Sequence, residues 1–303
     1  MSAPLIPYLP SPQIPLSFLR YIPLLNEWID PGNPPSIKPF GMLVALGVFI
    51  GVTTAIRRGK ERGYEPNAML EYLFWTVGTA FVVSHILDAV FYHPRMVLGD
   101  PLYLLRIWDG LSSYGGMIGM ALGSLGYKWR RRAKILGFAD VTCSVTPLAW
   151  VFGRAGCSVV HDHPGIHSNA WFAVQYPAYG GGIAGRLDLG LIEMVLTIPL
   201  AIAFAILWRR QPRRPDGYYM SLLGICYAPV RFLLDFLRVS PQELALSGDE
   251  RYWSLTPAQW ASFVLFALGV TLLMWIRRKP APGRASVSGA VAGADEAGAG
   301  PVR

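Results

Sequence analysis

The sequence has little charge. Only 15% of its 303 residues are Asp, Glu, Lys or Arg, whereas 52% are hydrophobic and the mean hydropathy is +0.35. A soluble domain averages about 25% charged residues, so this composition excludes an ordinary soluble protein and indicates an integral membrane protein. The net charge of +8 would suggest a nucleic-acid partner in a soluble chain. Here the basic residues form short clusters between apolar runs, so we expect membrane lipids, and no nucleic acid, as partners.

The sequence also has few cysteines, and its first residues lack a basic segment. Cys143, Cys157 and Cys226 are too few for a disulfide framework. Cys143 and Cys226 fall inside apolar runs, where a thiol is usually a small buried hydrophobe, whereas the role of Cys157 stays open. No basic residue precedes Arg20 and prolines interrupt the start, so we expect no cleaved signal peptide.

Composition divides the chain into three parts. Residues 1–38 are rich in proline and aromatic residues and are predicted to form an arm at the membrane interface. Residues 39–279 form the predicted transmembrane domain. Residues 280–303 are rich in Pro, Gly, Ala and Ser, which is typical of a disordered tail.

Seven apolar runs predict an all-α integral membrane protein with about seven transmembrane helices. The runs cover residues 40–56, 69–91, 114–127, 135–152, 189–208, 218–237 and 257–276. Dense Lys/Arg clusters follow the first, third, fifth and seventh runs, and such clusters stay in the cytoplasm. The sequence therefore predicts a periplasmic N-terminus and a cytoplasmic C-terminus.

Polar side chains gather at the predicted outer ends of these runs. They are Tyr114, Arg154, His161, Asp162, His163, Arg231, Asp235 and Arg238. The spacing of Arg231, Asp235 and Arg238 places them on one helical face, and an Arg231–Asp235 ion pair is one structural interpretation. That pair leaves Arg154 and Arg238 without assigned carboxylates. An excess of guanidinium groups at a lipid boundary predicts a phosphate site, because Arg holds phosphate through paired hydrogen bonds.

Two further patterns have more than one interpretation. Imidazole and carboxylate groups near residues 161–163 are metal-ligand types, and His167, His85 and Asp88 could join them. However, His161 and His163 lack the i, i+4 spacing of one helix face, so we expect no metal and no cofactor, and favour a hydrogen-bonded loop. The glycines of residues 113–119 resemble a phosphate loop only weakly, and in a membrane they more often mark close helix packing.

Taken together, four segments resemble the prolipoprotein diacylglyceryl transferase family of bacterial inner-membrane enzymes. Residues 100–110 (DPLYLLRIWDG) and 114–119 (YGGMIG) are similar to its DPLY…R-x-WDG and HGG-x-IG motifs. Residues 153–156 (GRAG) are similar to its G-R-x-G motif, and Gly165 falls where the family keeps a glycine. Residues 227–238 (YAPVRFLLDFLR) are similar to its Y-x-x-x-R-x-x-x-E-x-x-R motif.

The resemblance implies transfer of a diacylglyceryl group from phosphatidylglycerol to the lipobox cysteine thiol of a prolipoprotein, at the outer face of the inner membrane. It implies that Arg154 and Arg231 hold the phosphate and stabilise developing charge, while Arg238 and Asp235 position them. Tyr227, Gly115, Gly116 and Gly165 then belong to the substrate-binding set.

The sequence departs from the family at several of these positions. Tyr114 replaces the histidine of the HGG motif, Cys157 replaces an asparagine, and Asp235 replaces a glutamate. Phe40 replaces a tyrosine, His85 replaces an arginine, and a longer motif before the fifth run is reduced to Glu193. Tyr114 is a poor base but can donate a hydrogen bond, so His161 or His163 is expected to supply the base. A non-catalytic homologue, or one with another substrate, that binds phospholipid or lipoprotein is the alternative.

Overall fold

The computed structural model describes residues 6–12, 14–21, 36–92, 94–105, 110–177, 183–211, 213–239 and 253–278. The predicted disordered tail, residues 280–303, and residues 106–109 of the DPLY…WDG segment lie outside the described residues.

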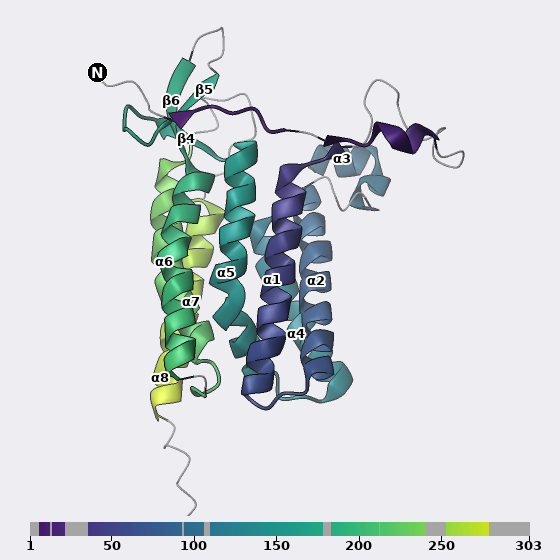
Figure 1. Cartoon of the computed structure of the whole chain (residues 1–303), viewed down its shortest axis with the longest axis vertical. Helices are drawn as coiled ribbons and strands as arrows, with labels where there is room; N and C mark the ends of the chain where they lie inside the picture. The colour runs from purple at the N-terminus through teal and green to yellow at the C-terminus, as the bar shows by residue number, and fades with distance from the viewer. Residues whose placement is uncertain are drawn as a thin grey trace, which may run out of the picture.

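Long helices packed side by side dominate the described part of the chain (Figure 1). They are α1 (Pro39–Glu61), α2 (Pro66–Tyr92), α4 (Ser113–Arg131), α5 (Leu136–Val160), α6 (Leu189–Arg210), α7 (Tyr218–Leu234) and α8 (Pro257–Arg278). The short helices are η1 (Ser17–Tyr21), α3 (Pro94–Gly99), η3 (Pro101–Leu105) and η4 (Asp235–Leu237). Each predicted apolar run coincides with one long helix. The third run, residues 114–127, is shorter than the roughly 20 residues that a membrane crossing needs.

Six of these helices are long and apolar enough to cross a membrane, which makes the protein a multi-pass membrane protein. The exception among the long helices is α4, whose 19 residues include several glycines and end in Lys128, Arg130 and Arg131. At about 1.5 Å per residue it is roughly 28 Å long, close to the ~30 Å hydrocarbon core. Composition, and not length, therefore separates α4 from the other six.

Glycines let α4 approach α2 closely. A Cβ atom on Gly115, Gly119 or Gly123 would lie 2.6, 2.6 or 2.4 Å from backbone atoms of Ser84, Ala80 or Trp75, respectively. The three glycines are four residues apart and so share one face, which is the small-residue spacing of close membrane helix pairs. The helix-packing interpretation of this glycine string is confirmed.

The all-α prediction is wrong at one end of the bundle, where short strands form a sheet beyond α5 and α6 (Figure 1). The strands β1 (Ile6–Pro7), β4 (Pro164–His167), β5 (Val174–Pro177) and β6 (Ile183–Asp188) have the order β1-β5-β6-β4. β1 runs parallel to β5, and the other pairs are antiparallel. A separate pair joins β2 (Ile14–Pro15) to β3 (Ser36–Ile37). Such short strands give little alternation of polar and apolar residues.

The opposite end of the bundle has a core of aromatic side chains. Tyr72, Phe138 and Tyr219 are buried there, and Arg62 reaches Asp140 at 2.8 Å to connect the end of α1 with α5. The candidate functional site lies in the other half of the bundle, near the sheet.

We predict that Gly119→Val and Gly123→Val separate α2 from α4. The added side chains meet backbone atoms of the facing helix, which cannot move without shifting the whole helix, and overpacking of this kind costs about 1–3 kcal/mol or more. Thermal unfolding in detergent should occur at a lower temperature. Gly78→Ala on α2 is the matched control, since a Cβ there has no neighbour within 4 Å. Equal stability of all three variants would contradict the packing account.

Candidate functional site

Arg154 lies inside α5, two turns before its end, because the helix continues past Phe152, where the predicted run ends. Its Nε atom is 3.1 Å from Oε1 of Glu193 on α6, and the side chains are 13% and 3% exposed. The hydroxyl of Tyr227 on α7 donates to the same Glu193 oxygen at 2.5 Å. One buried carboxylate therefore connects α5, α6 and α7 and holds the Arg154 guanidinium in place.

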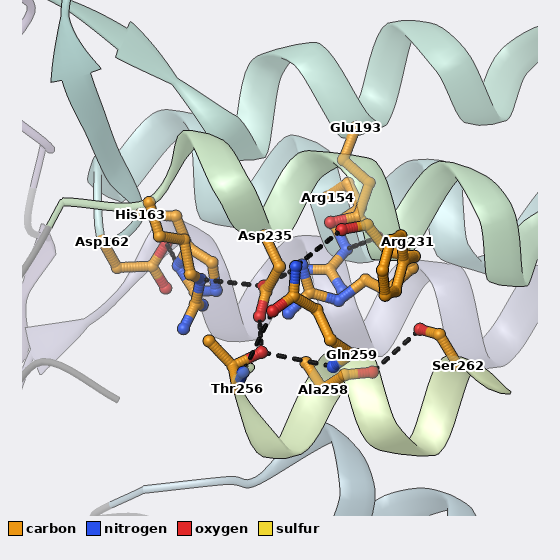
Figure 2. Close-up of polar contacts among 12 residues, drawn as sticks. Arg154, Asp162, His163, Glu193, Arg231, Asp235, Thr256, Ala258, Gln259 and Ser262 are labelled. Carbon is orange, nitrogen blue, oxygen red and sulfur yellow. Dashed lines mark hydrogen bonds and ion pairs between the residues drawn. The ribbon is translucent and has the colours of Figure 1, made fainter. Parts of the chain in front are cut away.

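A second buried carboxylate holds the other two arginines of the predicted site. Oδ1 of Asp235 lies 2.9 Å from Nη1 of Arg231 and 3.4 Å from Nε of Arg238, and Asp235 is fully buried. The i, i+4 spacing predicted the Arg231–Asp235 pair. Figure 2 shows this pair beside the Arg154–Glu193 pair.

The start of α8 supports Asp235. The Thr256 hydroxyl donates to Asp235 Oδ2, and it accepts from the Gln259 backbone N–H at 3.2 Å. The Gln259 side chain in turn accepts from the Thr256 backbone N–H at 3.0 Å. This reciprocal arrangement is a capping box, which satisfies the free N–H groups of a helix start (Figure 2). The same Gln259 donates to the Phe232 carbonyl at 3.2 Å, so α8 is fixed to α7 beside the arginines.

These arginines border a cavity of about 410 Å³ between the helices. Its polar end holds Arg154, Cys157, Asp162, His163, Tyr227 and Arg231. Apolar side chains such as Val48, Leu73, Val77, Met120 and Leu265 line the remainder, from α1, α2, α4 and α8. A cavity with apolar walls and two guanidinium groups at one end matches an amphiphile with an anionic head group.

The structure brings only some of the predicted site residues to the cavity. Gly116, His163, Tyr227, Arg154 and Arg231 belong to its lining. Asp235 and Arg238 lie behind Arg231, in the ion-pair network. Tyr114 is the second residue of α4, but its side chain is outside what the structure describes.

Two other predicted residues serve the packing of the fold. Gly115 contacts α2, where a Cβ would meet Ser84. Gly165 is buried in β4, and a Cβ there would lie 2.8 Å from the Leu237 carbonyl and 2.9 Å from that of Leu187. Both glycines permit close backbone contacts. Packing of the fold therefore explains why glycine is found at these two motif positions.

His161 also has a structural position. Its Nδ1 lies 2.6 Å from Asp188 Oδ2, and the same oxygen accepts from the Tyr176 hydroxyl at 3.0 Å. Burial raises the pKa of Tyr176, and the nearby Asp188 carboxylate raises it further, so the phenol stays protonated as a donor. Tyr8 stacks on the imidazole with ring centres 4.4 Å apart. His161 thus fastens the sheet to the end of α5, as the hydrogen-bonded loop interpretation expected.

The other histidines considered as metal ligands are separated in the fold. His167 lies beside Arg186, with Nε2 2.8 Å from Nη2, and His85 lies between the carbonyls of Gly110 and Tyr103 at 3.2 Å each. His163 is different, because its Nδ1 lies 2.6 Å from Asp162 Oδ1 and both side chains border the cavity near Cys157.

Sequence reasoning missed the carboxylate partners of Arg154 and Arg238. The sequence left both without an assigned carboxylate, but Arg154 is paired with Glu193 and Arg238 with Asp235. Three arginines face two carboxylates in this network, Glu193 and Asp235, and the excess of positive charge is 3 − 2 = +1. The available signal was Glu193 itself, a carboxylate inside an apolar helix, where charge is costly without a partner. Thr256 and Gln259 gave a second signal, since T-x-x-Q before an apolar run is a capping box.

Fold and site define a class of helical membrane proteins in which carboxylate-held arginines face an amphiphilic cavity. A comparison with family sequence models matches residues 32–275 to the prolipoprotein diacylglyceryl transferase family, and the chain belongs to that family.

Several curated relatives carry the name phosphatidylglycerol–prolipoprotein diacylglyceryl transferase. The one from Chromohalobacter salexigens is 29% identical over 252 residues, covering 82% of this chain and 91% of the relative. Those from Vibrio parahaemolyticus and Sodalis glossinidius are both 26% identical, covering 82% and 87% of this chain and 89% and 96% of the relatives. The likeness therefore extends over most of both chains.

We predict that Glu193→Gln destabilises the protein. Removing one member of a buried ion pair leaves the other charge without compensation, which costs about 3–5 kcal/mol. Thermal unfolding in detergent measures the loss. Glu71→Gln is the matched control, because Glu71 and Arg131 form an ion pair of similar length, 2.8 Å, at the surface, where solvent screens it. The interpretation fails if the two variants unfold at the same temperature.

Proposed function

We propose that this protein transfers the diacylglyceryl group of phosphatidylglycerol to the lipobox cysteine thiol of prolipoproteins. The observation that carries the proposal is the placement of Arg154 and Arg231 at the polar end of one largely apolar cavity, each held by a buried carboxylate. Membership of the transferase family and the names of the relatives support the same substrates.

In this reaction the sulfur of the acceptor attacks the glycerol carbon that bears the phosphate. A carbon–sulfur bond forms, the carbon–oxygen bond breaks, and its electron pair leaves with the phosphate oxygen of glycerol phosphate. The leaving phosphate gains negative charge, which the guanidinium groups of Arg154 and Arg231 stabilise through charge-assisted hydrogen bonds. Both arginines are fixed before substrate binds, so little reorganisation is needed as the charge develops.

The acceptor thiol must lose its proton, because thiolate is the nucleophile. Of the two predicted histidine bases, His163 lines the cavity, whereas His161 is bonded to Asp188. We therefore expect the acceptor thiol to lose its proton at the end of the cavity that holds His163.

We further propose that α4 is the seventh span, that the N-terminus is periplasmic and that the site opens to the outer face of a bacterial inner membrane. The basic ends of α1, α4, α6 and α8 support this orientation, because clustered Lys and Arg remain cytoplasmic. Arg154 and Arg231 lie near the C-terminal ends of α5 and α7, at the end of the bundle opposite these basic clusters.

The second candidate function is a homologue that binds phospholipid or lipoprotein without transfer, or that uses another substrate. Tyr114 and Cys157 favour it, since they stand where the family motifs have histidine and asparagine. The arginine clamp is compatible with both functions, so only a measurement of transfer separates them.

Complementation tests the proposal. In a bacterium depleted of its own transferase, this chain should restore lipidation of prolipoproteins, seen as a mobility shift. Arg154→Ala and Arg231→Ala should each lower transfer by about 100-fold or more, as loss of a donor to a developing anion does. Arg131→Ala, which removes an exposed arginine outside the cavity, should leave transfer unchanged.

Two results would count against the proposal. Normal membrane insertion without rescue would favour the non-catalytic alternative. Full activity of Arg154→Ala or Arg231→Ala would contradict the assigned phosphate clamp. If the Ala variants lose activity as expected, the corresponding Lys variants show whether charge alone suffices.

A further inference from the structure

Three metal-ligand side chains meet at the polar end of the cavity. One donor atom from each of Cys157, Asp162 and His163 lies within 4.8 Å of the other two. Cys157 is buried, with 7% of its surface exposed, and all three residues line the cavity. Figure 2 shows Asp162 and His163 side by side, next to the arginine network.

The cluster forms where α5 ends. Cys157 lies on the last turn of the helix, and Asp162 and His163 follow it in the chain. His161 ends the helix in a left-handed conformation, with φ of 53°. The chain then turns, which allows Asp162 and His163 to approach Cys157 one turn back along α5. The Leu189 N–H donates to the His163 carbonyl at 3.0 Å, and Gly190 lets α6 contact the Cys157 backbone. The cluster is therefore fixed from both α5 and α6.

The donor set matches zinc. Thiolate and imidazole are zinc ligands, carboxylate is acceptable, and three protein ligands with one open position are typical of catalytic zinc sites. Zinc bonds of about 2.0–2.3 Å in a tetrahedron place donors roughly 3.6 Å apart. Donors that already lie within 4.8 Å need to move by only about 1 Å to bind the ion.

We propose that Cys157, Asp162 and His163 bind a zinc ion whose open fourth position takes the acceptor thiol, an inference that rests on the proposed transferase function. Zinc coordination removes the proton of a thiol, so the site supplies the thiolate that Tyr114 cannot generate as a base. His163 then acts as a ligand and not as a proton acceptor.

The step balances without a further reactant. The acceptor thiol binds zinc and releases its proton to water. The zinc-bound sulfur forms the bond to the glycerol carbon, and glycerol phosphate leaves with the electron pair of the broken carbon–oxygen bond. Neutral thioether then dissociates from zinc, and the next thiol replaces it.

The position of the cluster suits this role. Arg154 is one helical turn from Cys157 on α5, and both residues line the cavity. A sulfur on the zinc would thus lie beside a phosphate held by Arg154. Covalent attachment of the lipid to Cys157 is the weaker alternative, because a thioether at a saturated carbon releases its thiolate far less readily than the phosphate ester releases phosphate.

Metal binding is tested first on the purified full chain. Cobalt(II) serves as the probe, because thiolate ligation gives a charge-transfer band that zinc displaces. Cys143→Ala with Cys226→Ala leaves Cys157 as the sole cysteine and should retain the band at about one cobalt per chain. Cys157→Ser should abolish the band, and His163→Ala should weaken binding by more than the roughly 10–100-fold that loss of an outer-shell residue costs. A band that persists in Cys157→Ser, or no band in the parent protein, would overturn the proposal.

Transfer is tested next, in vesicles of phosphatidylglycerol with a synthetic lipobox peptide. Metal removal should lower the rate by about 100-fold or more, as expected for a lost route to the thiolate, and zinc should restore it. Full activity without metal would overturn the zinc proposal and leave the transferase function standing. Stoichiometric zinc binding without any transfer would instead overturn the proposed function, while the metal site would stand.

Discussion

The site depends on two carboxylates that are buried in the bundle with their arginines. Glu193 holds Arg154, and Asp235 holds Arg231 and Arg238. Unpaired arginines at this depth would be costly, and arginines neutralised one for one would attract an anion weakly. The network has one more arginine than it has carboxylates. The carboxylates therefore position the guanidinium groups but do not neutralise all of their positive charge. Tyr227, Thr256 and Gln259 provide the hydrogen bonds that complete this arrangement.

Most of the helical architecture could be predicted from sequence, because hydropathy reports the length of each helix directly. The Arg231–Asp235 pair was also predictable, since both residues lie on one helix at i, i+4. The Arg154–Glu193 pair was not, because it joins α5 to α6 and depends on how those helices pack. The end of α5 was predicted eight residues early, since the arginine interrupts the apolar run although the backbone continues as a helix to Val160.

The roles of the two histidines could not be separated from sequence for a related reason. His161 and His163 are equivalent by proximity in sequence, yet the left-handed turn at His161 directs one toward the sheet and the other toward the cavity. The same turn brings His163 close to Cys157. Helical spacing such as i, i+4 does not predict this contact, because His163 lies beyond the end of α5. Cys157, which stands where the family motif has an asparagine, therefore meets a histidine that lies outside the matched motifs.

The parallel pairing of β1 with β5 has a consequence for biosynthesis. Ile6 pairs with Val174, a separation of 174 − 6 = 168 residues along the chain. The first strand leaves the ribosome long before its partner, and α1, α2, α4 and α5 are all synthesised in between. Closing so long a loop is slow compared with local helix formation. The pairing of β1 with β5 is therefore late compared with helix formation, and β1 remains without this partner until α1, α2, α4 and α5 have been synthesised.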